Sequence, residues 1–395
     1  MINIDRLLKN LKDIGEIGKG LDGKGISRLA FSKEYYDALR KLDNLARSKG
    51  FDTKIDKIGN LFITYNPNNK GKFIMIGSHL DTVKNGGLYD GALGIFSGFE
   101  ILETLKDKKR HLNHGIILAC FNAEEGSEMG GTFGSRSICG NNIISDEFKE
   151  KLAFYNLTLD DVKSCEMNLS NVVAFLEIHI EQGGTLENEK YDVGIVDGIV
   201  GITRYNIMIN GTANHAGTTP MNLRDDPIRK LPNVINKLYK EAKKFDQPFV
   251  MTIGNIIIKP GMYNVIPGSV EVLTEVRDLE QSNIEEYYDE IKKFVKADEK
   301  LEIYKNIEKP SVKLDENIIK IMIKTAKEND YNFKVMSSGA GHDAKEISKK
   351  IPTAMIFIPS IRGVSHSPEE YSKPEDIELG VNLFYDCVVE IDRSI

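Results

Sequence analysis

The chain has 395 residues, of which 41% are hydrophobic and 28% are charged, and its formal net charge is −7. This length favours two domains over one, and the composition is typical of a folded globular protein. The negative charge and the lack of a long basic run argue against a nucleic-acid partner, and the apolar runs are too short for a membrane span.

Several short apolar runs end close to a polar residue that can carry chemistry. The runs begin at Phe73, Ile116, Val172 and Thr353, and they precede His79, Glu124, His179 and His366, respectively. Helical patterns occupy 32–49, 92–106 and 374–393. Apolar runs without polar alternation predict strands that are buried on both faces. We therefore expect an α/β domain with a mostly parallel, helix-covered sheet, in which ligands bind beyond the carboxyl ends of the strands.

The middle of the chain has a different pattern. Its predicted elements, in order, are a strand at 204–210, a helix at 226–245, strands at 249–259 and 269–277 around a turn at 261–268, a helix at 282–296 and a strand at 301–305. This β-α-β-β-α-β order predicts a ferredoxin-like α+β insertion. We place the inserted domain at 200–312 and the catalytic domain at 1–199 and 313–395.

Four cysteines, Cys120, Cys139, Cys165 and Cys387, show no CxxC spacing. Together with an N-terminus that lacks the apolar core of a signal peptide, they predict reduced thiols in a cytoplasmic protein. A nucleophilic Cys120 is an alternative, but the apolar run around it favours a buried thiol.

The polar residues at the strand ends have the composition of a two-metal hydrolytic site. Asp81 is spaced to accept the second imidazole N–H of His79, and Asp90 follows in a Gly-rich turn from which its two oxygens can bridge two cations. Glu124 and Glu125 are adjacent and cannot point the same way from an extended segment. One should bind metal and the other should face a water molecule. His179 and His366 can complete one metal each.

Each of these signals is weak alone, because a buried histidine is more often hydrogen-bonded core than ligand. Their shared place at one sheet edge favours the metal site. Among the other histidines, His111 and His114 lie in a Lys/Arg-rich segment and are expected at the surface. The Gly-rich stretch before His342 and Asp343 predicts a tight active-site loop in which both side chains support the ligands.

The motifs together closely resemble the two-metal amidohydrolase family of N-carbamoyl-L-amino-acid hydrolases, allantoate amidohydrolases and β-ureidopropionases, and more distantly aminoacylases and zinc carboxypeptidases. The resemblance covers essentially the full length. It rests on Gly25–Leu29, Gly77–Val83, Gly87–Gly94, Asn122–Ser127, Glu177–Gly183, Ala213–Met221, Asn264–Gly268, Arg277–Asp278, Ser338–Ala344 and Gly363–Pro368. No metal or catalytic position departs from the family pattern.

The resemblance implies a zinc-exopeptidase-like catalytic domain with an inserted lid and dimerisation domain. It implies that Asp90 bridges two ions, with His79 and His179 on one ion and Glu125 and His366 on the other. Glu124 would be the general base, and the implied substrate-binding residues are Gln182, His215, Asn264 and Arg277. His215 would also stabilise the oxyanion, and Arg277 would bind a substrate carboxylate.

The expected reaction is hydrolysis of the ureido C–N bond of N-carbamoyl-L-amino acids by a metal-bridged hydroxide. Allantoate amidohydrolase is the runner-up, followed by a dipeptidase or aminoacylase, and a non-catalytic binding protein is a further alternative. Two divalent ions per subunit are expected, with zinc as first choice and manganese, cobalt or nickel also compatible with these ligands. The expected partners are a small carboxylate substrate and a second copy of the chain, joined through the inserted domain.

Overall fold

The computed structural model describes residues 1–20 and 24–395. Contacts divide the chain into two units: unit 1 comprises Met1–Asp197 and Leu314–Ile395, and unit 2 comprises Gly198–Lys313. The boundaries expected at 200 and 312 lie within two residues of these divisions.

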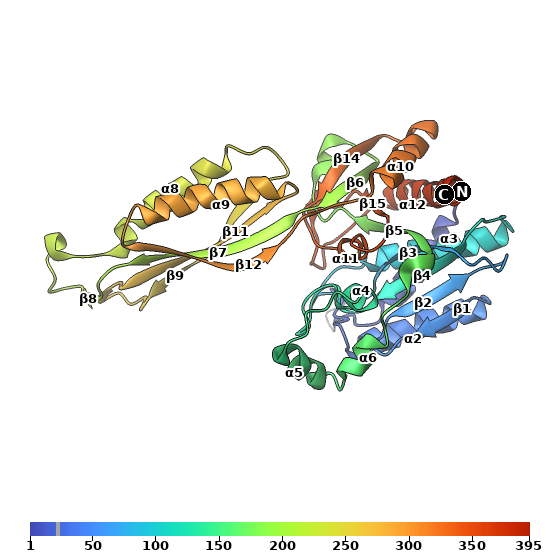
Figure 1. Ribbon diagram of the computed structural model, residues 1–395, viewed down its shortest axis with the longest axis horizontal. Helices are drawn as coiled ribbons and strands as arrows, with labels where there is room; N and C mark the ends of the chain where they lie inside the picture. Colours follow the sequence, from blue (N-terminus) through green and yellow to red (C-terminus); the bar gives the residue numbers. More distant parts are fainter. Residues whose placement is uncertain (21–23) are drawn as a thin grey trace. The chain divides into compact units, whose positions relative to one another are not determined.

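Unit 1 is built on one mixed sheet (Figure 1). The strand order is β1-β2-β4-β3-β5-β15-β6-β13, with β14 beside β6. The four central strands, β4, β3, β5 and β15, are parallel, whereas β1, β2, β6 and β13 pair antiparallel. Strand bounds are β1 Asp52–Ile55, β2 Leu61–Tyr65, β3 Phe73–His79, β4 Gly115–Phe121, β5 Val172–Ile180, β6 Val193–Ile199, β13 Val312–Lys313, β14 Phe333–Ser338 and β15 Thr353–Ile358. The α/β fold is confirmed.

Helices cover both faces of this sheet. Ile178 packs against Gly380 of α12, while the adjacent Glu177 accepts from the backbone N–H of Ala344 in α11. Since successive strand residues point to opposite faces, α11 and α12 lie on opposite sides. The helices of unit 1 are α1 Ile4–Gly15, α2 Lys33–Ser48, α3 Ala92–Asp107, α4 Phe133–Ile138, α5 Asp146–Phe154, α6 Leu159–Lys163, α7 Thr185–Glu189, α10 Glu316–Glu328, α11 Asp343–Ile347 and α12 Pro374–Ser394.

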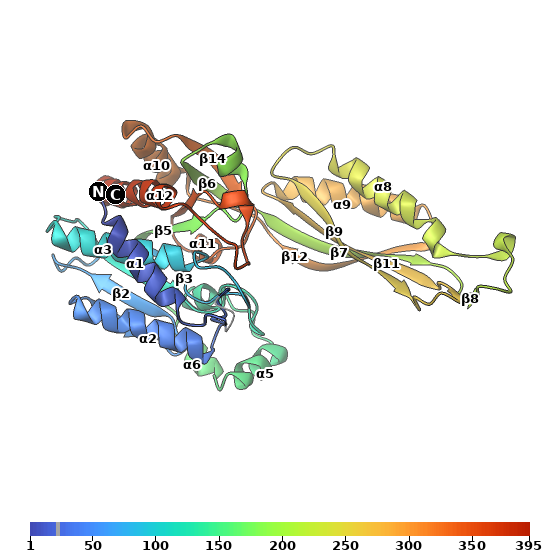
Figure 2. The same cartoon turned by 180° about the vertical axis from the view of Figure 1, so that it is seen from behind.

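The sequence patterns account for these elements. Every residue of β4 and β15 is buried, as expected for strands covered on both sides. Helix α2 begins after Ser32, whose hydroxyl accepts from the N–H of Tyr35. Near the start of the chain the N–H of Ile2 donates to Asn382 of α12, and Figure 2 shows α1 and α12 of this unit from behind.

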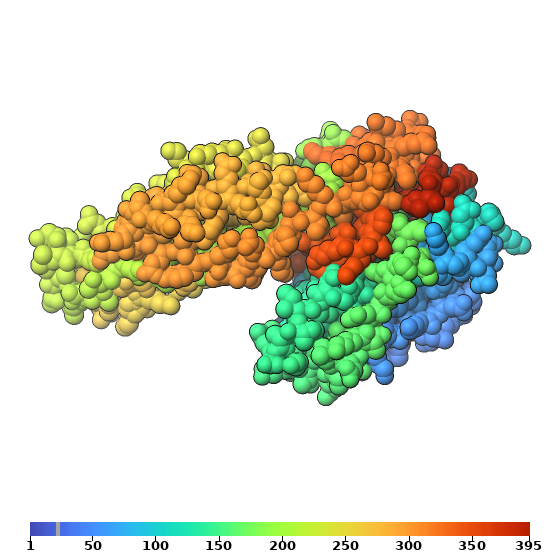
Figure 3. Space-filling view, in the orientation of Figure 1, coloured from blue at the N-terminus to red at the C-terminus, as the bar shows by residue number. Residues whose placement is uncertain are grey.

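Unit 2 has a four-stranded antiparallel sheet in the order β12-β7-β11-β9, the ferredoxin-like arrangement. Burial alternates along β11, because one face packs on two helices and the other does not. Figure 3 shows α9 (orange) on the surface of this unit. Its main elements are β7 Gly201–Asn210, α8 Leu231–Ala242, β9 Val250–Lys259, β11 Ser269–Asp278, α9 Gln281–Lys296 and β12 Leu301–Lys309. The segment expected as a plain turn also contains β10 Val265–Ile266, which pairs with β8 Asn214–His215.

His114 is buried, so its expected surface position was wrong, whereas His111 is exposed. The carboxylate of Asp392 explains this burial. It accepts the backbone N–H of His114 at 2.8 Å and lies 3.2 Å from its Nδ1 atom. Among the described residues, no helix is both long and apolar enough to span a membrane.

Candidate metal centre

The predicted ligands of unit 1 meet at the carboxyl ends of its parallel strands. His79 is the last residue of β3, and His179 is the penultimate residue of β5. Glu124 and Glu125 follow β4, and His366 follows β15 after a short helical turn, Ile361–Gly363. Parallel strands that end together thus bring four distant segments of the sequence to one edge.

The first set of candidate ligands is His79, Asp90 and His179, and all three are buried. Asp90 Oδ1 lies 3.5 Å from His79 Nε2 and 3.1 Å from His179 Nε2. The Nδ1 atoms face the backbone carbonyls of Asp81 at 3.0 Å and Ile180 at 2.9 Å. A carbonyl can only accept, so Nδ1 carries the proton in the neutral imidazoles. In each ring Nε2 then carries the lone pair that could bind a cation.

The second set is Asp90, Glu125 and His366. His366 Nε2 lies 3.3 Å from Asp90 Oδ2 and 3.2 Å from Glu125 Oε2. Asp90 therefore belongs to both sets, with one oxygen directed to each. The grouping of ligands is the same as the one the family resemblance implies.

Two buried oxygen atoms show that a cation fits here. Asp90 Oδ1 and Glu125 Oε1 have no hydrogen-bond partner among the described residues. Buried carboxylate oxygens are costly to leave unpaired. The His and carboxylate donors suit zinc and other divalent transition metals.

Gly91 makes the close packing of this centre possible. Its φ angle is +62°, and a Cβ atom there would lie 2.4 Å from the His79 ring. Its N–H also donates to His179 Nε2 at 3.2 Å. The glycine turn therefore lets the backbone after Asp90 run directly against two ligand imidazoles.

Asp81 acts differently from the expectation. The carbonyl of Asp81, not its carboxylate, accepts from His79 Nδ1, and the nearest carboxylate oxygen is 3.8 Å away. The carboxylate instead accepts the backbone N–H groups of Glu124 at 3.2 Å and Glu125 at 3.1 Å. Asp81 thus orients a histidine with its main chain and the glutamate pair with its side chain.

Glu124 is buried beside the first set, with Oε2 3.8 Å from His79 Nε2. Burial raises the pKa of Glu124 well above its ordinary value, while His79 opposes this shift and the charge of Glu125 adds to it. A carboxyl group with a raised pKa holds a proton more readily, which suits a general base that must later return it.

Gln182 lies against the shared ligand. Its side-chain amide donates to Asp90 Oδ2 at 3.0 Å, so its predicted contact with substrate stays a prediction. Two further residues at Asp90 were not anticipated from the sequence. Ser365 Oγ lies 3.3 Å from Asp90 Oδ2, and Glu370 accepts the backbone N–H of Asp90 at 3.0 Å.

His342 and Asp343 are buried beside the ligands. The His342 ring packs edge-on against His179, with ring centres 4.6 Å apart, and its Nε2 atom lies 2.9 Å from Ser338 Oγ. Burial raises the pKa of Asp343 well above its ordinary value, and the charge of Glu177 adds to this. Cys120 is also buried, and burial raises the pKa of its thiol, which argues against a nucleophile.

The other predicted substrate residues belong to unit 2. His215 pairs with Val265 in the β8–β10 ribbon, and the carbonyl of Asn264 accepts from Ala216. His215 Nδ1 accepts two backbone N–H groups, at 3.0 Å and 3.2 Å, so the neutral ring carries its proton on Nε2. That N–H is a suitable donor to an oxyanion.

Arg277 does not lie near these two residues within unit 2. Ser269 pairs with Asn210 at one end of β11, and Arg277 pairs with Ile202 at the other end. The strand rise places the two ends about 25 Å apart. Arg277 Nε also donates to Glu275 at 2.7 Å.

The chain matches the profile of Peptidase family M20/M25/M40 over residues 75–390. It is 34% identical to the N-carbamoyl-L-amino-acid amidohydrolase of Pseudomonas sp. (strain NS671), over 98% of both chains. It is 33% identical to the allantoate amidohydrolase of Bacillus subtilis (strain 168), over 96% of this chain and 95% of the relative. A solved amidase of the hydantoinase/carbamoylase family from Burkholderia multivorans has a TM-score of 0.87 at 26% identity and covers 98% of this chain and 97% of its own.

The charges at this site predict that cation binding depends on pH. Without metal, hydrogen bonds to Asp90 and Glu125 raise the pKa of His366 to about 10. Burial alone would lower the pKa of His79, but Asp90 and the other carboxylates raise it well above its ordinary value. A cation must therefore compete with protons for these two rings.

We therefore expect the affinity for Zn²⁺ to increase between about pH 6 and pH 9, with protons released on binding. Isothermal titration calorimetry in two buffers of different ionisation enthalpy measures the released protons. An affinity that stays constant over this pH range would contradict the assignment of these imidazoles as ligands.

Proposed function

This chain belongs to the peptidase family M20/M25/M40, and on that premise we propose that it hydrolyses N-carbamoyl-L-amino acids. The observation that carries the proposal is the pair of ligand sets joined through Asp90, with Glu124 beside them. Full-length similarity to an amidohydrolase of this name supports the substrate class. Allantoate amidohydrolase is the second candidate, because the similarity to a relative of that name is nearly equal.

The proposed cofactor is a pair of divalent cations, with zinc as first choice. His79, Asp90 and His179 would hold one ion, and Asp90, Glu125 and His366 the other. Cations at these positions would polarise the ureido carbonyl and make a water molecule more acidic.

Glu124 would move the proton in the reaction. Its carboxylate would take a proton from the attacking water and give it to the leaving nitrogen as the C–N bond breaks. One water is consumed for each N-carbamoyl amino acid, and the products are the free amino acid, ammonia and CO2. Asp81 holds the backbone of Glu124, which keeps the base in place during both transfers.

The proposed substrate contacts require two copies of the chain. His215 and Asn264 lie near one end of β11 and Arg277 lies at the other, about 25 Å away, so one small substrate cannot contact both ends of the same unit. We therefore propose a homodimer through unit 2. In this dimer the partner supplies either His215 and Asn264 or Arg277. Sedimentation velocity should show a dimer, and a monomer at micromolar concentration would contradict it.

A cytoplasmic location is proposed from the cysteines. All four are buried and unpaired thiols, as expected in a reducing compartment.

Turnover of a substrate panel tests the proposed function. Metal-replete protein is incubated with N-carbamoyl-L-amino acids, N-carbamoyl-β-alanine, allantoate and a dipeptide, and products are identified by mass spectrometry. We expect free L-amino acids from the carbamoyl compounds, and we expect chelation to abolish the activity. Turnover of allantoate alone would establish the second candidate with the same site, and turnover of the dipeptide alone would refute both.

Replacement of Glu124 tests its role as base. Glu124→Gln removes the proton acceptor but keeps the size of the side chain, so kcat should fall by about 10²–10⁴-fold. The metal content, measured by inductively coupled plasma mass spectrometry, should not change. Glu128→Gln is the control, because Glu128 is an exposed carboxylate in the same loop. A Glu124→Gln enzyme with normal kcat would show that another group moves the proton.

A further inference from the structure

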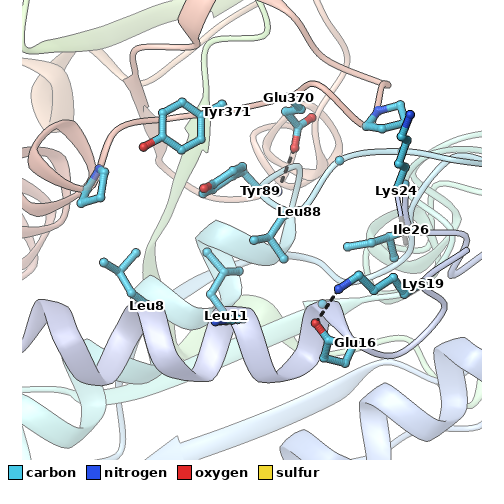
Figure 4. A pocket seen from close by; sticks show the side chains of 17 residues that line it. Leu8, Leu11, Glu16, Lys19, Lys24, Ile26, Leu88, Tyr89, Glu370 and Tyr371 are labelled. Atoms are coloured by element: carbon cyan, nitrogen blue, oxygen red, sulfur yellow. Dashed lines mark hydrogen bonds and ion pairs between the residues drawn. The ribbon is translucent and has the colours of Figure 1, made fainter. Parts of the chain in front are cut away.

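We propose that Glu370 is the positioning residue that holds the shared ligand Asp90 in place between the two ligand sets. The inference rests on the proposed metal centre and goes beyond it, because Glu370 lies outside both sets. One oxygen of its carboxylate, Oε1, accepts the backbone N–H of Tyr89 at 2.8 Å and that of Asp90 at 3.0 Å. Figure 4 shows Glu370 above Tyr89, at the wall of a cavity of about 510 Å³.

The second oxygen of Glu370 acts through Ser365. Ser365 Oγ lies 3.0 Å from Glu370 Oε2 and 3.3 Å from Asp90 Oδ2. A hydroxyl has only one hydrogen to donate, and the shorter distance favours Glu370 as its acceptor. Glu370 thereby draws the Ser365 proton away from Asp90, so that Oδ2, which already accepts from Gln182, keeps a second lone pair for a cation.

Close packing fixes the position of the Glu370 carboxylate. Only 5% of the residue is exposed, and a Cβ atom on Gly87 would lie 2.1 Å from Glu370 Oε1. A side chain at position 87 would therefore displace the carboxylate. Gly87 and Glu370 therefore pack directly against each other, although they are far apart in the sequence.

This contact joins the two segments that carry the ligands. Asp90 stands in the turn before α3, whereas Ser365 and His366 stand in the loop before α12. Glu370 bonds to both segments and so sets the 3.3 Å separation between Asp90 Oδ2 and His366 Nε2. Because Asp90 belongs to both ligand sets, loss of Glu370 should weaken the binding of both ions together.

Titration of the metal-free protein with Zn²⁺ tests this role. Glu370→Ala should lower the affinity of both sites by about 10–100-fold. Glu370→Gln keeps an oxygen for the two backbone N–H groups but cannot also accept from Ser365, so its affinity should fall between those of wild type and Glu370→Ala. The shorter Glu370→Asp should bind as weakly as Glu370→Ala. The control is Glu369→Gln, since Glu369 is exposed and adjacent.

Thermal unfolding of the metal-free variants separates positioning from folding. If Glu370→Ala does not fold, the Zn²⁺ affinities of Glu370→Asp and Glu370→Gln are compared instead. Equal affinities of these two variants would overturn the inference. An affinity of Glu370→Ala within twofold of wild type would also overturn it while leaving the proposed function intact. Wild-type protein that binds no Zn²⁺ would instead refute the metal centre itself.

Discussion

A dense group of buried carboxylates at the strand ends of unit 1 is the constraint on which the rest of the structure depends. Anionic groups are costly to bury unless positive charge or hydrogen bonds accompany them. The surroundings of these carboxylates shift their pKa values in different directions. Burial opposes the ionisation of Asp90, yet the three histidines around its carboxylate hold its pKa well below the ordinary value, whereas burial raises the pKa of Glu124. Asp90 is thereby suited to remain a ligand and Glu124 to exchange a proton.

Backbone groups provide most of the orientation at this centre. The carbonyls of Asp81 and Ile180 fix the two imidazoles, and N–H groups of the glutamate pair and of the Asp90 turn bind the carboxylates of Asp81 and Glu370. Ile180 is the last residue of β5, and Asp81 stands two residues after the end of β3. Ligand geometry is therefore a property of the fold more than of individual side-chain rotamers.

Much of unit 1 and the proximity of the candidate ligand side chains could be predicted, because buried parallel strands leave continuous apolar runs that end in polar residues. The antiparallel strand β6 was missed, since Gly194, Asp197 and Gly198 interrupt its apolar pattern. His114 was predicted at the surface because its partner Asp392 lies 278 residues away. The residues next to His114 in the sequence do not indicate that contact. Glu370 was missed for the same reason, since it stands beside the exposed Glu369 and acquires its role only through the distant Asp90 turn.

The insertion point of unit 2 also affects the order in which the protein assembles. Residues 198–313 are complete in the growing chain before β15 is made, yet β15 lies between β5 and β6 in the sheet. Ile199 and Val312 are paired where the chain enters and leaves the insertion. Once unit 2 has folded, the segments on either side of it are already neighbours, which removes the entropy cost of closing a long loop. His366 follows β15, so the candidate ligand set becomes complete only after unit 2 has been made.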